Sequence, residues 1–243
     1  MYNILKGQIT SLLPKKTLFW LEPFLRKSYA LTKKGTNHFC SVCKFHTSNF
    51  EKLTNSDLLC PNCGSLSRDR RLWQVVKENY IKNGNFVLDF SPSRSLFRKW
   101  KKELNINYTA SDLSGDFIAD VAYDITQING ENNYFDLIIC YHILEHVIED
   151  EKAMKELYRV LKPNGTILIQ TPFKEGEIYE DYSITSEAER LKHFNQKDHV
   201  RIYSVAGLKN RLEKAGFLVK VIQHDADTYL GFSANEVILF ATK

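Results

Sequence analysis

The stretch "YFDLIICYHILEHVIEDEKAMKELYRVLKPNGTILIQTPF", residues 134–173, decides the fold of this chain. It begins with an apolar run of strand length, residues 134–141, and ends with a second one, residues 166–173. Between them, residues 149–161 carry apolar side chains at helical spacing, and "KPNG" supplies the proline and glycine that end a helix. A strand, a helix and a strand in this order predict two parallel strands with a crossover helix.

The same alternation continues on both sides of this stretch. Strand-like runs include "NFVLDF" and "INYTASDL" before it and "LVKVIQ" and "EVILFATK" after it, with helical segments such as "SVAGLKNRLEKAGF" between them. Strand–helix alternation predicts a parallel sheet with helices on both faces. Ligands of such sheets lie beyond the carboxyl ends of the strands, which points to Asp89, Asp112, Asp124 and residues 140–146.

Four of the five cysteines form two CxxC pairs, "CSVC" and "CPNC". Two residues between cysteines let a tight turn aim both sulfurs at one ion, and zinc prefers four such ligands in a tetrahedron. The spacing predicts a closed structural zinc ribbon; two disulfides or a redox pair are the alternatives. The expected zinc ligands are Cys40, Cys43, Cys60 and Cys63.

The segment "GSLSRDRRLW" follows the second pair at once. Arg68, Arg70 and Arg71 either bind a phosphate or carboxylate, or form the basic first turn of the helix "RDRRLWQVVKENYI". We assign residues 37–83 to the zinc-ribbon module and its linking helix, and residues 84–243 to the α/β domain.

Composition and charge narrow the class of protein. Apolar residues make up 43% and charged residues 26%, values typical of a globular chain. No run approaches the roughly 18 apolar residues of a membrane span, and the N-terminus lacks the features of a signal peptide. We therefore expect a cytoplasmic protein, in a reducing compartment where paired cysteines bind metal.

The net charge of +4 is unevenly distributed. Residues 1–36 carry seven basic side chains against Glu22, a charge of +6, so the other residues sum to −2. We expect a basic amphipathic helical segment over 1–36. It is either a solvated helix or contacts an anionic membrane surface, a phosphorylated substrate, nucleic acid or a protein partner. Membrane contact would place the protein at the inner face of the membrane.

The string at residues 134–172, and the order of elements over 84–243, resemble class I S-adenosylmethionine-dependent methyltransferases. The resemblance implies a Rossmann-like, doubly wound, mostly parallel sheet of seven strands. With "CPNCGSLSRDR" and "LKHFNQKDHVRIY", the whole chain is similar to a zinc-ribbon-bearing subset associated with modification of cell-envelope or capsule polysaccharides.

The resemblance also implies the cofactor site. The first strand reads "VLDFSPSRS", so serines and a proline stand where the family has a glycine-rich turn after its acidic residue. Asp112 matches the family's ribose-binding acid, and Asp124 with Ile125 matches the contacts to adenine. The implied cofactor residues are Asp89, Ser91, Ser93, Asp112, Asp124, Ile125 and Cys140. For each aspartate, a cap of a loop or helix is the alternative role.

His142, Glu145 and His146 lie on one face if a helix begins after the strand. The pattern is similar to the ExxEH motif of some metal-dependent methyltransferases, with His142 in place of the first Glu. One hypothesis is a catalytic divalent metal on these three residues, completed by His193 or His199. The alternative is that Glu145 and His146 cap the helix and shape the pocket.

Methyl transfer to a hydroxyl needs a base, and histidine suits that role near neutral pH. The candidate catalytic residues are His142, Glu145, His146 and His199. In "HFNQKDHVRIY", His193, Asp198 and Arg201 are candidate acceptor contacts, with Asp198 orienting a histidine and Arg201 holding an anion. A salt-bridged loop is the alternative for this cluster.

We predict methyl transfer to a small polar acceptor, such as a hydroxyl of a sugar or of a phosphorylated cell-envelope precursor. A second hypothesis is RNA methylation with substrate recognition by the zinc ribbon, although the slightly acidic residues 37–243 argue against nucleic-acid binding. A third is an inactive methyltransferase-fold scaffold, which the missing glycines in "DFSPSRS" would explain.

Overall fold

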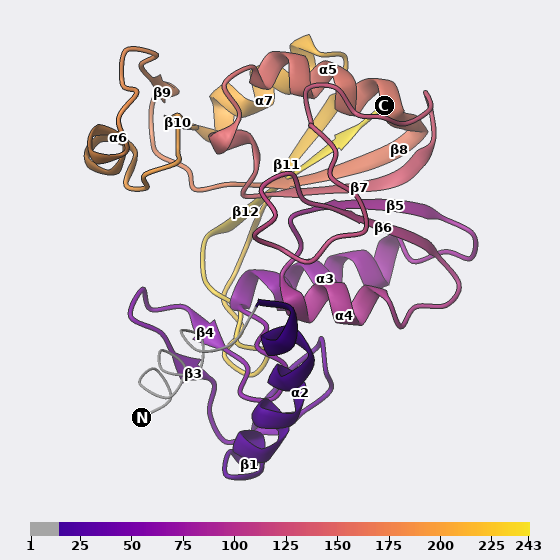
Figure 1. Ribbon diagram of the computed structural model, residues 1–243, viewed down its shortest axis with the longest axis vertical. Coiled ribbons are helices and arrows are strands. Elements are labelled where there is room, and N and C mark those ends of the chain that lie inside the picture. Colours follow the sequence, from indigo (N-terminus) through magenta and orange to yellow (C-terminus); the bar gives the residue numbers. More distant parts are fainter. Residues whose placement is uncertain (1–14) are drawn as a thin grey trace. The chain divides into compact units, whose positions relative to one another are not determined.

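The computed structural model describes residues 15–243, which group into two compact units (Figure 1). Residues 15–79, 93–99 and 225–234 form the ribbon unit. Residues 80–92, 100–224 and 235–243 form the sheet unit. Two short segments further along the chain, residues 93–99 and 225–234, are therefore grouped with the N-terminal segment. Among residues 15–243, no helix combines the length and apolar character that a membrane crossing requires.

The sheet unit is built on six strands in the order β11-β12-β8-β7-β5-β6. The four strands from β8 to β6 run parallel, and β12 pairs antiparallel with both β8 and β11. This confirms the predicted Rossmann-like, mostly parallel α/β sheet. The strands are β5 (Phe86–Phe90), β6 (Asn107–Ser111), β7 (Phe135–Tyr141), β8 (Leu161–Gln170), β11 (Leu218–His224) and β12 (Glu236–Thr242).

The expected number of seven strands is wrong for this sheet, which has six strands in the part of the chain that the structure describes. The segment that could add one, "DFIADVAYDIT", forms no strand of the sheet: Val121 makes an isolated parallel bridge to Ser111, and Asp124 an isolated antiparallel bridge to Gln127. The carboxylate of Asp120 accepts the backbone N–H of Ala110 at 2.9 Å. A side chain therefore takes a donor that a strand ladder would use, and the pairing stops there.

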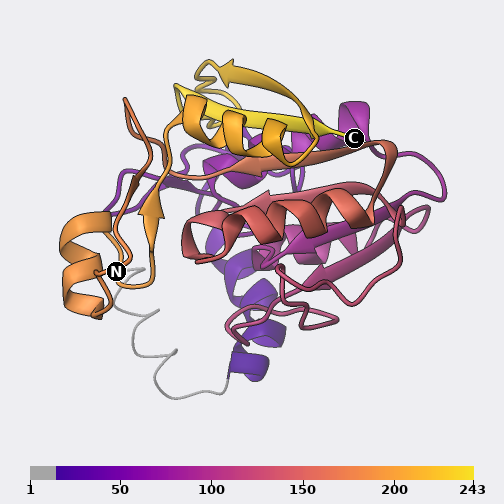
Figure 2. The ribbon, with the colours of Figure 1, turned by 90° about the horizontal axis from the view of Figure 1, so that it is seen from above.

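The helices α5 (Asp150–Val160) and α7 (Val205–Lys214) lie together on one face of this sheet (Figures 1 and 2). The predicted apolar stripe of α5 is buried, and the helix ends before "KPNG" as predicted. Strand β7 is almost fully buried because it lies inside the sheet, which explains its unbroken apolar run. The buried stripe of α5 consists of Ala153, Met154, Leu157 and Val160.

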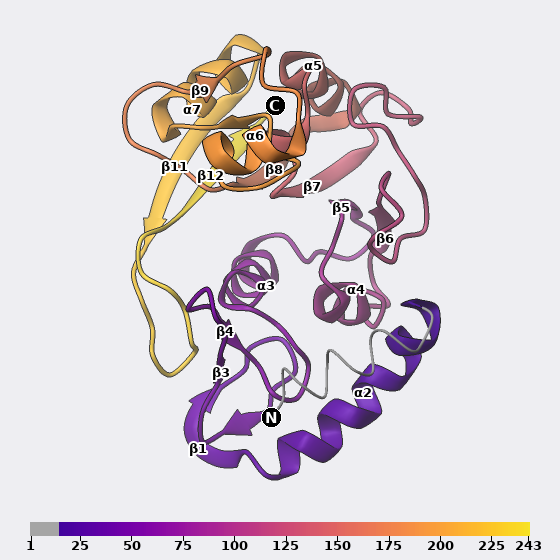
Figure 3. The same cartoon turned by 60° about the vertical axis from the view of Figure 1, so that its left-hand side comes forward.

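An insertion lies between β8 and α7 in the sheet unit (Figure 3). It contains β9 (Tyr179–Glu180), α6 (Glu187–Phe194) and β10 (Arg201–Ile202), and β9 pairs antiparallel with β10. Serine 186 caps α6 by accepting the backbone N–H of Glu189, and Asn195 ends it in a left-handed conformation.

In the residues that the structure describes, the ribbon unit has two small hairpins and three helices. Strand β1 pairs with β2, and β3 pairs with β4. The expected N-terminal helical segment is represented by α2; residues 1–14 lie outside the described residues. The elements are α2 (Lys15–Leu31), β1 (Lys34–Phe39), β2 (His46–Thr47), β3 (Glu51–Lys52), β4 (Leu58–Leu59), α3 (Ser67–Asn79) and α4 (Arg94–Trp100), the last residue of α4 being grouped with the sheet unit.

Arginines 70 and 71 hold the ribbon unit together instead of presenting an anion site. The guanidinium of Arg70 is fully buried and donates to the carbonyls of Ser65 at 2.7 Å and Gly231 at 2.6 Å. Arg71 donates to the carbonyl of Asp225. Both arginines lie at the start of α3, as the alternative prediction of a basic first turn has it, and the structure adds that their guanidinium groups are used in internal hydrogen bonds.

Candidate functional site

The four predicted zinc ligands meet in the ribbon unit. One potential ligand atom from each of Cys40, Cys43, Cys60 and Cys63 lies within 4.8 Å of the others. The Sγ atoms of Cys40 and Cys63 are 3.7 Å apart, as are those of Cys43 and Cys60. Zinc–sulfur bonds of about 2.3 Å in a tetrahedron place sulfurs about 3.8 Å apart. The cluster therefore fits a structural zinc ion.

The two CxxC turns have the same backbone design. Lys44 and Gly64 each follow the second cysteine of a pair and adopt positive φ angles of 59° and 79°. Each donates its backbone N–H to the carbonyl of the first cysteine, at 2.8 Å from Lys44 and 2.9 Å from Gly64. The Ser65 hydroxyl lies 3.3 Å from the Cys40 sulfur and 3.2 Å from the Cys63 sulfur. Such contacts orient zinc-binding thiolates.

In the sheet unit, β5 ends at the turn that differs from the family's glycine-rich pattern. Ser91 adopts a φ of +47°, a left-handed conformation that favours glycine. Its hydroxyl donates to the carboxylate of Asp112 at 2.7 Å. The serine therefore provides the backbone turn that a glycine would, and joins the ends of β5 and β6.

Asp89 and Asp112 are both buried near these strand ends. Asp89 accepts a hydrogen bond from the Tyr108 hydroxyl at 3.1 Å. Asp112 accepts from the Ser114 hydroxyl at 3.0 Å and from the backbone of Phe117 at 3.2 Å. The carboxylate of Asp112 is thus an acceptor held by loop donors, the chemical type that binds ribose hydroxyls.

The other implied cofactor residues have different surroundings. Asp124 is exposed and caps its own loop, because the backbone N–H and hydroxyl of Thr126 both donate to it at 2.8 Å. These bonds lower the pKa of Asp124. Ile125 and Cys140 are buried in the apolar core of the sheet unit. Ser93 belongs to the ribbon unit, where its hydroxyl accepts the backbone N–H of Leu96 in α4 at 3.3 Å. Their contacts with a cofactor stay predictions.

The polar cluster after β7 is compact. His142 adopts a φ of +56°, and its Nδ1 lies 3.3 Å from Oε1 of Glu145. Glu145 is the middle residue of the short helix η1 (Leu144–His146) and is only 1% exposed. Burial raises the pKa of Glu145, but the contact with His142 and the charge of His146 lower it by more, so its pKa lies below the ordinary value.

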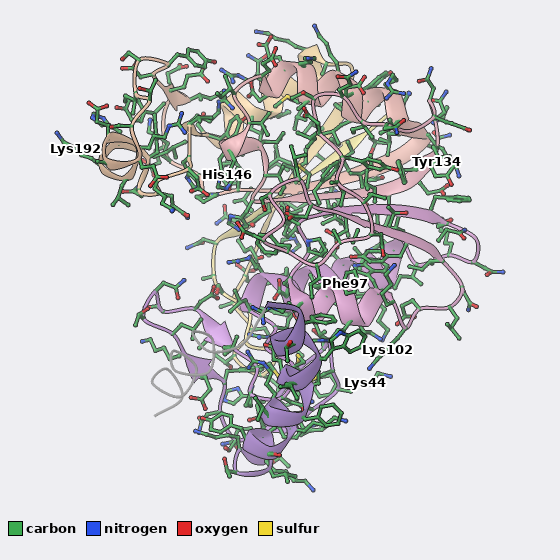
Figure 4. The ribbon with its side chains drawn as sticks, in the orientation of Figure 1. Lys44, Phe97, Lys102, Tyr134, His146 and Lys192 are labelled. Atoms are coloured by element: carbon green, nitrogen blue, oxygen red, sulfur yellow. The ribbon has the colours of Figure 1, made fainter. Side chains whose placement is uncertain are left out.

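His146 and His199 approach each other although 52 residues separate them in the chain. Their rings are 4.7 Å apart between centroids and perpendicular, and His146 is labelled in Figure 4. The carboxylate of Asp198 lies 3.3 Å from Nδ1 of His146, and its predicted role of orienting a histidine stays a prediction. Burial and the neighbouring His146 lower the pKa of His199, which favours the neutral imidazole.

The two other candidate acceptor contacts lie apart from this pair. His193 on α6 is bonded to the Tyr179 hydroxyl at 2.7 Å. Arg201 is fully buried and donates to Glu180 at 2.9 Å and to the carbonyl of Ile148 at 2.8 Å. These contacts favour the salt-bridged alternative for Arg201, because its guanidinium is already enclosed by protein acceptors.

Two polar residues at the end of β8, Gln170 and Thr171, were not predicted as site residues from the sequence. Gln170 Oε1 and Thr171 Oγ1 are buried and accept no hydrogen bond from the residues that the structure describes. The backbone carbonyl of Gln170 accepts the N–H of His142 at 2.8 Å, which places β8 beside the histidine cluster. Their signal was the change from apolar to polar residues within "TILIQT".

A cavity of about 490 Å³ lies elsewhere in the sheet unit, beside the start of α5. Asp150, Glu180, Tyr182 and Arg211 are among its lining residues, whereas none of the predicted site residues lines it. We therefore place the candidate active site at the strand ends and not in this cavity.

The fold is that of an α/β domain with a Rossmann-like sheet, and the candidate site lies at the carboxyl edge of that sheet. A model described as a methyltransferase domain matches residues 66–221, well over half of the chain, and the chain belongs to this family. A structure of an S-adenosylmethionine-dependent methyltransferase from Archaeoglobus fulgidus aligns with 71% of this chain and 91% of that one, at a TM-score of 0.51 and 20% identity. That likeness supports the fold.

The curated relatives match this chain over only part of their own length. An uncharacterised protein of Methanocaldococcus jannaschii is 30% identical over 141 residues, which cover 54% of this chain and 61% of the relative. The ubiquinone/menaquinone biosynthesis C-methyltransferase UbiE of Neisseria meningitidis is 27% identical over 118 residues, covering 41% and 48%. The chain thus spans about half to three fifths of these relatives. The matches support the prediction that this chain is an S-adenosylmethionine-dependent methyltransferase.

Proposed function

We propose that this protein transfers a methyl group from S-adenosylmethionine to a hydroxyl of a small polar acceptor. The observation that carries this proposal is the pairing of Ser91 with Asp112 at the ends of β5 and β6. It keeps a left-handed turn after β5 beside the acid that the resemblance assigns to ribose, although the glycines are missing. S-adenosylmethionine supplies a methyl group on a sulfonium leaving group.

The chain's own residues have separable tasks in this proposal. Asp112 would accept hydrogen bonds from the ribose hydroxyls in place of its present loop donors. The cluster of His142, Glu145, His146 and His199 would hold the acceptor hydroxyl in line and receive its proton. Gln170 and Thr171 offer unused buried acceptors beside that cluster.

Calorimetric titration of zinc-replete protein with S-adenosylmethionine and with its demethylated product tests the cofactor site. We expect micromolar binding that Asp112→Ala weakens at least tenfold. The substitution removes the carboxylate that would accept hydrogen bonds from the ribose hydroxyls of the cofactor. Asp181→Ala is the matched control, because Asp181 is an exposed aspartate whose carboxylate accepts the backbone N–H of Ser183 at 2.9 Å and its hydroxyl at 2.6 Å. Absence of binding to folded protein would favour the inactive scaffold.

We propose a sugar or a phosphorylated cell-envelope or capsule precursor as the acceptor. The support is the similarity of "CPNCGSLSRDR" and "LKHFNQKDHVRIY" to the polysaccharide-modifying subset. The second of these strings forms the end of α6 and β10 and delivers His199 to His146. Incubation with sugar phosphates and nucleotide sugars should give a product heavier by one methyl group. Methylation of RNA alone, with salt-sensitive RNA binding, would favour the RNA hypothesis.

We also propose that α2 contacts an anionic membrane surface. Phe19 and Ala30 are buried, whereas the opposite face exposes Trp20 by 73% and Phe24 by 70%. Lys27 is exposed on the same helix, within a segment of net charge +6. Aromatic side chains beside basic ones are typical of helices that lie in the membrane interface. The exposed apolar residues are Trp20, Leu21, Phe24, Leu25 and Leu31.

Sedimentation with phosphatidylglycerol vesicles tests this contact. We expect binding that high salt weakens and that Trp20→Ser with Phe24→Ser abolishes. Leu104→Ser is the control, because Leu104 is an apolar residue of the sheet unit that is even more exposed, at 92%. Equal binding by both variants, or binding to neutral vesicles alone, would reject an anionic membrane as the partner of α2.

A further inference from the structure

Glu145, His146 and His199 form a second cluster with the composition of a metal site. One potential ligand atom from each lies within 4.8 Å of the others. Two of the residues belong to η1 and the third precedes β10. The backbone N–H of Val200 donates to the carbonyl of Glu145 at 2.9 Å, so a main-chain hydrogen bond fixes the two segments beside each other.

The buried carboxylate of Glu145 gives independent support. Glu145 is 1% exposed, and neither of its oxygens accepts a hydrogen bond from the residues that the structure describes. His142 approaches only one of them, Oε1, at 3.3 Å. A buried carboxylate is costly without a cation or hydrogen-bond donors. A cation between Glu145 and the two imidazoles would satisfy the oxygens that the protein leaves unbonded.

We infer that Glu145, His146 and His199 bind a divalent transition-metal cation such as Mn²⁺. Two imidazoles and one carboxylate suit such ions and leave coordination positions open to a ligand. The nitrogen and oxygen ligands distinguish this site from the four-thiolate cluster, which is closed. The Asp198 carboxylate, 3.3 Å from His146, provides the kind of contact that orients a metal-binding histidine.

The structure revises the ligand set that the sequence suggested. His199, and not His193, lies with Glu145 and His146, since His193 is bonded to Tyr179. His142 contacts Glu145 from outside the set of three. The open positions define the acceptor class, an inference that rests on the proposed methyl transfer. An acceptor with a hydroxyl beside a second oxygen donor could occupy two of them, and the cation would polarise that hydroxyl.

Titration of zinc-replete protein with Mn²⁺, with the free ion followed by electron paramagnetic resonance, tests the site without using activity. We expect one Mn²⁺ per chain, bound at least tenfold more weakly by Glu145→Gln and by His199→Ala. His193→Ala is the matched control and should bind as the wild type does, because it removes a histidine of the same insertion that lies outside the cluster.

A second measurement uses the unaltered protein, in case a substitution prevents folding. Bound Mn²⁺ should broaden the imidazole proton resonances of His146 and His199 far more than those of His193. No saturable binding, or equal broadening of all three, would overturn the inference. S-adenosylmethionine binding measured on the same sample separates the outcomes: its loss would contradict the proposed function, whereas its persistence without Mn²⁺ binding would contradict the metal site alone.

Discussion

At the residue scale, Ser91 shows how a family pattern is kept without its usual residue. The chain departs from the glycine-rich turn in sequence, yet Ser91 adopts the left-handed φ of +47° at that turn. Serine tolerates this conformation less well than glycine does, and its hydroxyl bond to Asp112 is a local contact that a glycine could not make. The departure therefore couples the turn after β5 to Asp112, the acid that the resemblance assigns to ribose binding.

Substitution of Ser91 should separate backbone strain from the hydroxyl bond. Ser91→Val forces a β-branched residue into the left-handed region and should cost about 1–3 kcal/mol of unfolding free energy. Ser91→Gly relieves the strain while removing the same hydroxyl, so it serves as the control. Urea denaturation measures both, and equal stability of the two variants would contradict the assigned strain.

The sequence predicted the site residues that are neighbours in the chain better than those that come together only in the fold. His142, Glu145 and His146 lie within five consecutive residues after a recognisable strand, so their proximity was predictable. The approach of His199 depends on the fold of the insertion, and only the tertiary structure pairs it with His146. The same limit explains Arg201, whose charge suggested an anionic acceptor but whose guanidinium is enclosed by carbonyls and Glu180.

At the element scale, a buried ionic network fixes the insertion that carries His199. Glu180 on β9 binds Arg201 on β10 at 2.9 Å and also pairs with Arg211 on α7. Arg211 binds Asp150, at the start of α5, at 2.6 Å. Four elements therefore meet at these side chains, and the network positions the polypeptide on both sides of His199.

The network should make stability depend on pH. Burial raises the pKa of Glu180, but Arg211 and Arg201 lower it by more, to below the ordinary 4.5. The carboxylate therefore contributes stability that is present above pH 4.5 and is lost as pH falls through the lowered pKa. The stability difference between wild type and Glu180→Gln should shrink in that acidic range, as urea denaturation at several pH values will show.

A matched variant identifies the cause of that pH dependence. Glu187→Gln removes an exposed carboxylate of α6 whose partner, Lys197, lies 3.9 Å away, so it should leave the acid transition unchanged. A constant difference between wild type and Glu180→Gln at all pH values would contradict the lowered pKa of Glu180.

The elements themselves were largely predictable. The apolar run of β7, the helical spacing of α5 and the stop at "KPNG" each follow from local sequence, and the structure has all three. The prediction of a seventh strand was wrong because the Asp120 side chain accepts the backbone N–H of Ala110 in β6. Residue periodicity does not reveal such a contact.

At the scale of the whole molecule, the ribbon unit includes a segment from the far end of the chain. Arg70 links the carbonyls of Leu58 and Ser65, near the cysteine cluster, with those of Leu230 and Gly231. The sequence placed the boundary between modules at residues 83 and 84. It gave no sign that residues 225–234 group with the ribbon, because backbone carbonyls that accept from a distant arginine have no sequence signature.

Removal of zinc should therefore be detectable in residues 225–234. Chelation would free the cysteine turns that set the position of Ser65, so Arg70 would lose its alignment. We expect hydrogen–deuterium exchange to accelerate in residues 37–66 and 225–234, while β7 and β8 stay protected. Cys60→Ser should lose bound zinc and show the same faster exchange. Cys140→Ala should keep both the zinc and the slow exchange, because Cys140 lies in the sheet unit. Unchanged exchange in 225–234 would contradict the coupling.

The capture of residues 225–234 by Arg70 also has a consequence for biosynthesis. The ribosome makes the cysteine turns early, whereas the carbonyls of Leu230 and Gly231 emerge more than 150 residues later. Domains usually fold in the order in which they are synthesised. In this chain the ribbon unit cannot complete its contacts until β5 through β11 have been synthesised, so its folding cannot be finished before most of the sheet unit has left the ribosome.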